Sequence, residues 1–191
     1  MPFKVCRVSG GARLDSLPVA VIKNYPLELR DYKPYAQCNI CLDENNLLLR
    51  MWAFEVSPPQ GSELRAVFYL FPHRPDTALH VVIRPGGECE IALCANGIFT
   101  TQKPPDGFRL RPHNGEDLQG VYWGGLAHLP LSWLDSLADG VGLSLGGSFL
   151  GNFYKLCEGP VFAHKGSYFP ADYQSGCFGK KSMGEFLVVS Y

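Results

Sequence analysis

The chain has 191 residues, which is close to the usual size of one domain. Its 17 lysines and arginines nearly cancel its 18 aspartates and glutamates, and no basic stripe is visible. This balance argues against nucleic-acid binding and against a polybasic membrane anchor. Hydrophobic residues make up 46% of the chain and aromatic residues 13%, which suffices for one sizeable core. We therefore expect a single domain over residues 1–191.

The N-terminal segment lacks the uninterrupted apolar run of a secretory signal, and no later run is long enough to span a bilayer. Seven cysteines without such a signal indicate free thiols in a reducing compartment. The expectation is a cytoplasmic protein that does not bind membranes. The sequence leaves its oligomeric state open.

Short strands punctuated by turns dominate the first half of the chain. Residues up to Lys23 predict one or two strands. The clearest element is a β-hairpin over residues 35–56, in which two apolar runs flank the turn-forming residues 43–46. A strand follows over residues 64–71. A second hairpin is predicted from strands at residues 78–84 and 88–94.

The second half follows the same pattern with one interruption. Residues 96–120, rich in Pro, Gly and Arg, predict long loops, and residues 121–128 predict a strand. A helix is expected over Leu131–Ala138, because Pro130 suits a first helical turn. Strands are predicted at residues 147–157, 160–164 and 184–189, with a long aromatic loop over residues 165–183. One short helix among about ten strands predicts an all-β fold, a two-sheet antiparallel β-sandwich.

Two motifs that resemble metal sites have simpler interpretations. Cys38 and Cys41 form a C-x-x-C inside a predicted strand, where residues three apart point to opposite faces, so we interpret them as small packed side chains. A calcium loop that begins at Asp43 would need a glycine and an acid where Leu48 and Phe54 stand. The sequence therefore predicts no metal site and no cofactor.

No catalytic constellation is visible either. The five histidines are scattered, no G-x-S-x-G motif occurs, and the acids fall mostly in turns. His80 and His128 lie in predicted strands and are expected to be packed or at an edge. We expect a protein that is not an enzyme.

The aromatic loop is the best candidate for binding. Flat rings beside hydrogen-bond donors suit a sugar, whose C–H face is apolar and whose rim carries hydroxyls. The candidate stacking surfaces are Tyr168, Tyr173 and Phe178, and the candidate donors are Arg84 and Lys180. The alternative interpretation is that these rings cap one end of the sandwich.

The order of elements resembles the family 9 carbohydrate-binding modules and their relatives, many of which are freestanding bacterial proteins. The resemblance covers about residues 15–190 and is carried by the hairpin at 35–56, Val67 to Pro72, Trp123 to Trp133, Asn152 to Lys155, His164 to Tyr168, and Gly184 to Val188. The family's two sandwiching tryptophans have no counterpart here, because residues 57–62 contain none and the second falls near Cys177 or Phe178.

This resemblance implies a β-sandwich and a non-catalytic module that recognises mono- or oligosaccharides in bacterial glycan metabolism. Two alternatives remain open from the sequence. The chain could be a glycan-active hydrolase or an enzyme remnant on the same sandwich, which requires acids or histidines clustered in one cleft. It could also be a protein-interaction or dimerisation domain that uses its aromatic loop.

Overall fold

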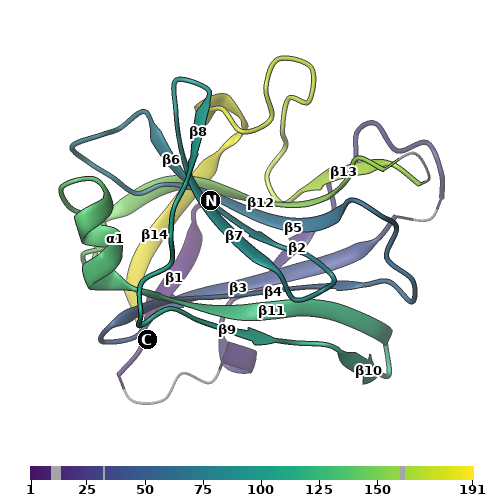
Figure 1. Ribbon diagram of the computed structural model, residues 1–191, viewed down its shortest axis with the longest axis horizontal. Helices are drawn as coiled ribbons and strands as arrows, with labels where there is room; N and C mark the ends of the chain where they lie inside the picture. Colours follow the sequence, from purple (N-terminus) through teal and green to yellow (C-terminus); the bar gives the residue numbers. More distant parts are fainter. Residues whose placement is uncertain (10–13, 32, 160–161) are drawn as a thin grey trace.

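The computed structural model describes residues 1–9, 14–31, 33–159 and 162–191 (Figure 1). Within them the helices are α1 (Leu131–Leu137) and two short 3-10 turns at Leu14–Ser16 and Lys180–Ser182. The strands are β1 (Phe3–Arg7), β2 (Ala20–Ile22), β3 (Tyr35–Leu42), β4 (Asn46–Phe54), β5 (Ser62–Tyr69), β6 (Thr77–Ile83), β7 (Cys89–Ala95), β8 (Ile98–Thr101), β9 (Arg109–Pro112), β10 (Gly115–Asp117), β11 (Gly120–Pro130), β12 (Ser148–Cys157), β13 (His164–Ser167) and β14 (Gly184–Ser190).

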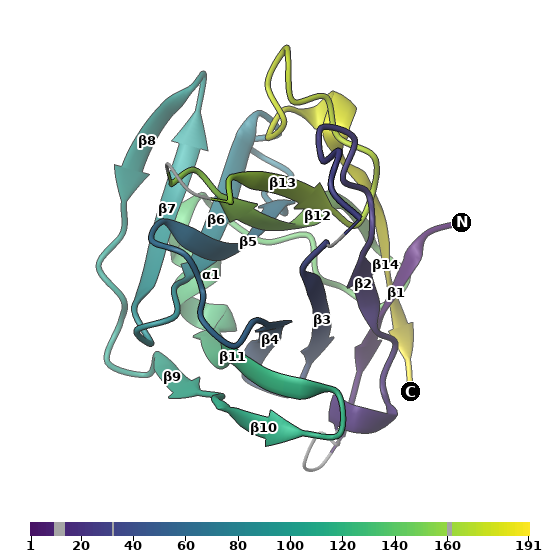
Figure 2. The same cartoon turned by 90° about the vertical axis from the view of Figure 1, so that its right-hand side faces the viewer.

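All strands of the described residues belong to one curled sheet. Its main path is β10-β11-β4-β3-β1-β14-β12-β5-β6-β7-β8, while β2, β9 and β13 pair at its sides. In Figure 2 the sheet runs from β10 and β11 at the bottom, through β1 and β14 on the right, to β7 and β8 on the left. The curled sheet thereby encloses the core like half of a barrel.

The strand pairing corrects part of the predicted architecture. The mostly β fold and the short helix are confirmed. The prediction of two separate antiparallel sheets is wrong. Strand β1 lies parallel to both β14 and β3 and joins the two halves into one mixed sheet. The strands that join are far apart in sequence, so local patterns carry no signal for this link. No helix of the described residues has the length and apolar character needed to cross a membrane.

The core fills the concave side of the sheet. Phe68 of β5 contacts Phe153 of β12 edge to face, with ring centroids 5.6 Å apart, and Phe149 stacks on Phe186 at 5.2 Å. Rings in these arrangements contribute about 0.5–1.5 kcal/mol beyond their burial. Side chains alternate along each strand, so every second residue of β5 and β6 points away from this core.

The predicted hairpin at residues 35–56 is confirmed as β3 and β4. The Asp43 carboxylate accepts hydrogen bonds from the backbone N–H groups of Asn45 and Asn46, so it closes the turn, as its interpretation required. Cys38 lies in the main core and Cys41 in a second cluster on the other face, and both are free thiols.

The second predicted hairpin is confirmed as β6 and β7, and the helix ends one residue early, at Leu137. The long loops predicted over residues 96–120 are wrong, because β8, β9 and β10 lie there. These are short edge strands with mostly exposed side chains, so they lack the alternation that marks a half-buried strand. Of the strand predicted at 160–164, residues 160 and 161 lie outside the described residues, and β13 begins at His164.

Candidate functional site

A pocket of about 260 Å³ lies on the convex face of the sheet, over β5, β6 and β7. Its lining comes from alternate residues of these strands and from the exposed strand β8. The residues are Arg65, His80, Val82, Arg84, Glu90, Ala92 and Phe99. We call it the outer-face pocket.

His80 is a buried polar group without a hydrogen bond. Only 2% of the residue is exposed, and neither ring nitrogen has a partner among the described residues. Burial, with a smaller effect of the Arg65 charge, lowers the pKa of His80 to about 3, so the ring is neutral near pH 7 and offers one donor and one acceptor. Leaving such groups unpaired costs about 1–3 kcal/mol each.

The buried imidazole predicts a distinct pH dependence of stability. Its pKa of about 3 in the folded protein lies below the value of about 6.5 expected after unfolding. The unfolded state therefore binds more protons in this window, and the free energy of unfolding falls by about 1.2 kcal/mol as the pH drops from 6 to 5. In the variant His80→Leu this contribution is absent, so urea unfolding at several pH values gives a flatter profile. Parallel profiles for the two proteins contradict the prediction.

Two aromatic rings flank His80. The Phe99 ring lies 4.9 Å from the imidazole and the Phe178 ring lies 5.3 Å from it, both edge-on. The guanidinium of Arg65 covers the Phe178 ring at 4.7 Å. Phe99 is about half exposed, at 51%, and offers a ring surface at the open side of the pocket. The result is a polar floor between two apolar walls.

The charges around the pocket are balanced. Arg84 donates to the Glu90 carboxylate at 2.9 Å and lies 3.9 Å from that of Glu63, which also accepts from Arg65. Both arginines are thus paired with acids, and the pocket carries no net charge from these four groups. Both acids are occupied as ion-pair partners of arginine. In the described residues no group of three or more His, Cys, Asp or Glu side chains is placed to hold a metal ion.

Two of the five residues predicted from sequence meet at this pocket. Arg84 lines it, and Phe178 contacts His80 and Arg65 beside it. Lys180 lies apart, where its ammonium donates to the Asp76 carboxylate at 2.6 Å.

The other two predicted residues pack onto the sheet. Tyr173 belongs to the apolar cluster around Tyr154 on the convex face. Tyr168 packs against the main core, where its ring lies 5.6 Å from that of Phe3. Phe178 belongs to the same cluster as Tyr173, whereas Tyr168 packs on the main core, so the three predicted rings do not form one surface. The role of the five residues in sugar binding stays a prediction.

Sequence reasoning missed His80 and Phe99 as site residues. The sequence indicated that His80 is packed or at an edge, and its burial shows that it is packed, but its lack of hydrogen-bond partners depends on the tertiary structure. Phe99 lies in β8, within the stretch interpreted as loops. A usable signal was the polar residues Arg65, His80 and Arg84, which interrupt apolar strands on one face.

No protein-family model and no curated protein sequence matches the chain. Solved structures do. A putative carbohydrate-binding protein from Bacteroides uniformis ATCC 8492 superposes with a TM-score of 0.74 at 15% identity, covering 98% of both chains. A family 9 carbohydrate-binding module from Caldicellulosiruptor kristjanssonii in complex with glucose gives 0.60 at 13% identity, covering 100% of this chain and 97% of the module.

A family 9 module from the same organism, in complex with cellotriose, gives a TM-score of 0.55 at 13% identity and covers 98% of this chain and 94% of the module. Identities this low establish the fold and leave the ligand to be argued from the site. Over essentially its whole length, the chain has the fold of the family 9 carbohydrate-binding modules.

Proposed function

We propose that the chain is a non-catalytic carbohydrate-binding module whose outer-face pocket binds one ring of a neutral mono- or oligosaccharide. The observation that carries the proposal is His80, a buried neutral imidazole with two unpaired nitrogens between two aromatic rings. A sugar hydroxyl can accept a hydrogen bond from the protonated nitrogen or donate one to the other nitrogen, so two hydroxyls of one sugar ring would satisfy the imidazole. The apolar C–H face of the sugar matches the Phe99 ring.

Two further observations support this function. The pairing of Arg65 and Arg84 with acids leaves no net charge to attract an ionic ligand, which favours a neutral one. The similar solved structures include modules in complex with glucose and cellotriose, and this makes glucose and short glucans the first ligands to test. We further propose a role with short oligosaccharides in bacterial glycan metabolism.

The decisive variant is Phe99→Ala, with Ile98→Ala as its matched control. Both side chains are large, apolar and exposed on β8, but only Phe99 lines the pocket. Losing the stacking ring is expected to weaken sugar binding at the outer-face pocket by about tenfold or more, which corresponds to about 1.4 kcal/mol or more. Isothermal titration calorimetry with glucose and cellotriose measures this, and Ile98→Ala is expected to bind like the unaltered protein.

A glycan array broadens the search to other sugars. The proposal fails if neither the array nor calorimetry detects binding of any neutral sugar. It also fails if the Phe99→Ala and His80→Leu variants each bind sugar as tightly as the unaltered protein does. Release of reducing ends from bound oligosaccharides would instead favour the glycan-active enzyme.

A further inference from the structure

A buried ion pair lies on the concave side of the sheet, opposite the outer-face pocket. Lys155 of β12 is fully buried, and Glu55, which directly follows β4, is 7% exposed. The Lys155 ammonium lies 3.2 Å from Oε2 of Glu55, and the same oxygen accepts a hydrogen bond from the Trp123 indole at 2.9 Å. Buried charges are costly to desolvate and persist only where their partners are well placed.

The hydrogen bonds of this network assign its protons. His164 Nδ1 lies 2.8 Å from the backbone carbonyl of Phe162, which can only accept, so Nδ1 carries the proton. Nε2 is then the acceptor for the Lys155 ammonium at 2.8 Å. Burial and the adjacent Lys155 charge lower the pKa of His164, in agreement with a neutral ring. The third proton of Lys155 reaches Ser62 Oγ at 3.3 Å, so all its donors are used.

One acceptor remains unused. Among the described residues, the only polar atom recorded near Oε1 of Glu55 is His164 Nε2 at 4.0 Å, and this nitrogen has no proton to donate. The Glu55 carboxylate lines a pocket of about 350 Å³, which we call the mouth pocket. A carboxylate held rigidly by an indole and an ammonium therefore presents a free oxygen to an open pocket.

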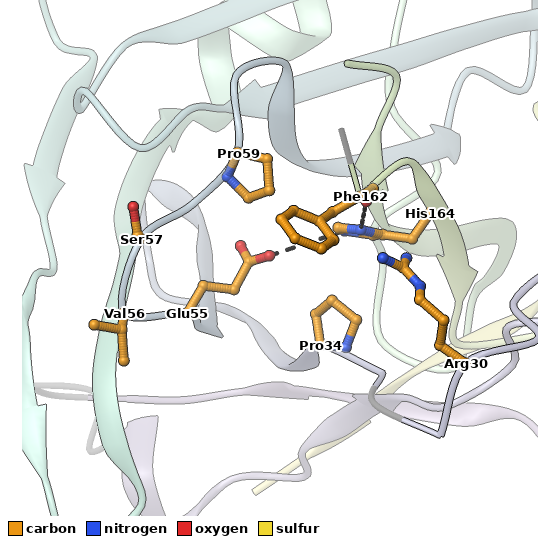
Figure 3. Close-up of a pocket in the computed structure, with 8 residues that line it drawn as sticks. All are labelled: Arg30, Pro34, Glu55, Val56, Ser57, Pro59, Phe162 and His164. Carbon is orange, nitrogen blue, oxygen red and sulfur yellow. Dashed lines mark hydrogen bonds and ion pairs between the residues drawn. The ribbon is translucent and has the colours of Figure 1, made fainter. Parts of the chain in front are cut away.

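The walls of the mouth pocket are apolar. Figure 3 shows the Phe162 ring beside the Glu55 carboxylate, with Pro34 and Pro59 on either side. Phe162 is 62% exposed and has a φ of 58°, a left-handed backbone that a bulky residue rarely adopts. The hydrogen bond from His164 to its carbonyl holds this conformation, so the buried network also fixes the ring that forms one wall.

The charges select the kind of ligand. The Glu55 carboxylate is neutralised by Lys155, and the Arg30 guanidinium, which lies over Phe162 at 5.5 Å, is paired with Glu28. Neither a cation nor an anion gains net attraction from these pairs. A neutral ligand with a hydroxyl for Oε1 and an apolar face for Phe162 satisfies both features.

We propose that the mouth pocket is a second carbohydrate site, which binds one neutral sugar ring by a hydroxyl hydrogen bond to Glu55 and by packing on Phe162. Its volume lies at the lower end of the range for small-molecule sites, in accord with a single ring. The two pockets lie on opposite faces of β5, where Ser62 faces the Lys155 network and Arg65 faces the outer-face pocket. The second site rests on its own geometry and does not require the first to be occupied.

The test uses Phe99→Ala protein, in which the outer-face pocket is impaired and the mouth pocket is intact. The indole N–H of Trp123 donates to Glu55, so its ¹⁵N-labelled NMR signal reports on the carboxylate. Titration with glucose or cellotriose is expected to shift this signal with saturation. Adding Phe162→Ala weakens this binding by about tenfold or more, while Leu118→Ala, a fully exposed control elsewhere, leaves it unchanged.

The charge argument is tested with glucosamine as its ammonium form and with glucuronate. Both are expected to bind the mouth pocket more weakly than glucose, and tighter binding of either overturns the choice of a neutral ligand. An unmoved Trp123 signal, while the unaltered protein still binds sugar, overturns the second site and leaves the outer-face proposal standing. A shift that is insensitive to Phe162→Ala also overturns it. If none of these proteins, the unaltered one included, binds sugar, both proposals are overturned.

Discussion

The variant Lys155→Met is expected to lose about 3–5 kcal/mol of unfolding free energy, measured by urea denaturation at pH 7. The substitution removes the ammonium and leaves the Glu55 carboxylate buried without its counter-charge. It also leaves His164 Nε2 and Ser62 Oγ without their donor. The loss comes mainly from this uncompensated charge, because a methionine side chain fills a similar volume.

A double variant distinguishes the charge effect from a packing effect. Glu55→Gln combined with Lys155→Met removes both charges and keeps an acceptor for the Trp123 indole. We expect it to recover much of the stability lost in the single variant, which gives a favourable coupling energy between the two positions. If Lys155→Met alone costs less than about 1 kcal/mol, as an exposed pair would, the buried pair does not carry the stability assigned to it.

The β3–β4 hairpin was predictable because its signals are local. Two apolar runs and an Asx turn at Asp43 lie within about twenty residues of one another. The closure of the sheet was not predictable, since it depends on β1, which pairs with β14 from the other end of the chain. The residue pattern of a strand does not indicate which other strand it pairs with. The sequence therefore predicted the presence of the strands more accurately than the number of sheets that they form.

The same distinction holds for the candidate sites. Arg84 and Phe178 were identified because a basic residue and an aromatic loop are visible in the sequence, whereas the tertiary fold alone brings Phe99 beside His80. The pairing of Glu55 with Lys155 spans about a hundred residues and was missed. Its one local signal was a lysine at the centre of the otherwise apolar run at residues 153–157.

The close contact between β11 and β4 makes Gly124→Ala the second large effect. Gly124 lies opposite Trp52, and a Cβ built on it would lie 2.0 Å from the Met51 carbonyl oxygen and 2.7 Å from the Trp52 Cα. Both atoms belong to the backbone of a strand that is paired on both sides, so they cannot move without breaking the ladder. The expected loss is about 3 kcal/mol or more of unfolding free energy, or failure to fold.

Gly86→Ala is the matched control, because a Cβ at Gly86 meets nothing within 4 Å and its backbone is not left-handed. It is expected to change the free energy of unfolding by less than about 0.5 kcal/mol, or to raise it slightly by restricting the unfolded chain. Thermal and urea unfolding of both variants measure the contrast. Equal stabilities would show that β4 and β11 lie farther apart than the structure places them. The separation of the strands at Gly124 also sets the position of its neighbour Trp123, so the hydrogen bond from Trp123 to the Glu55 carboxylate would then be misplaced as well.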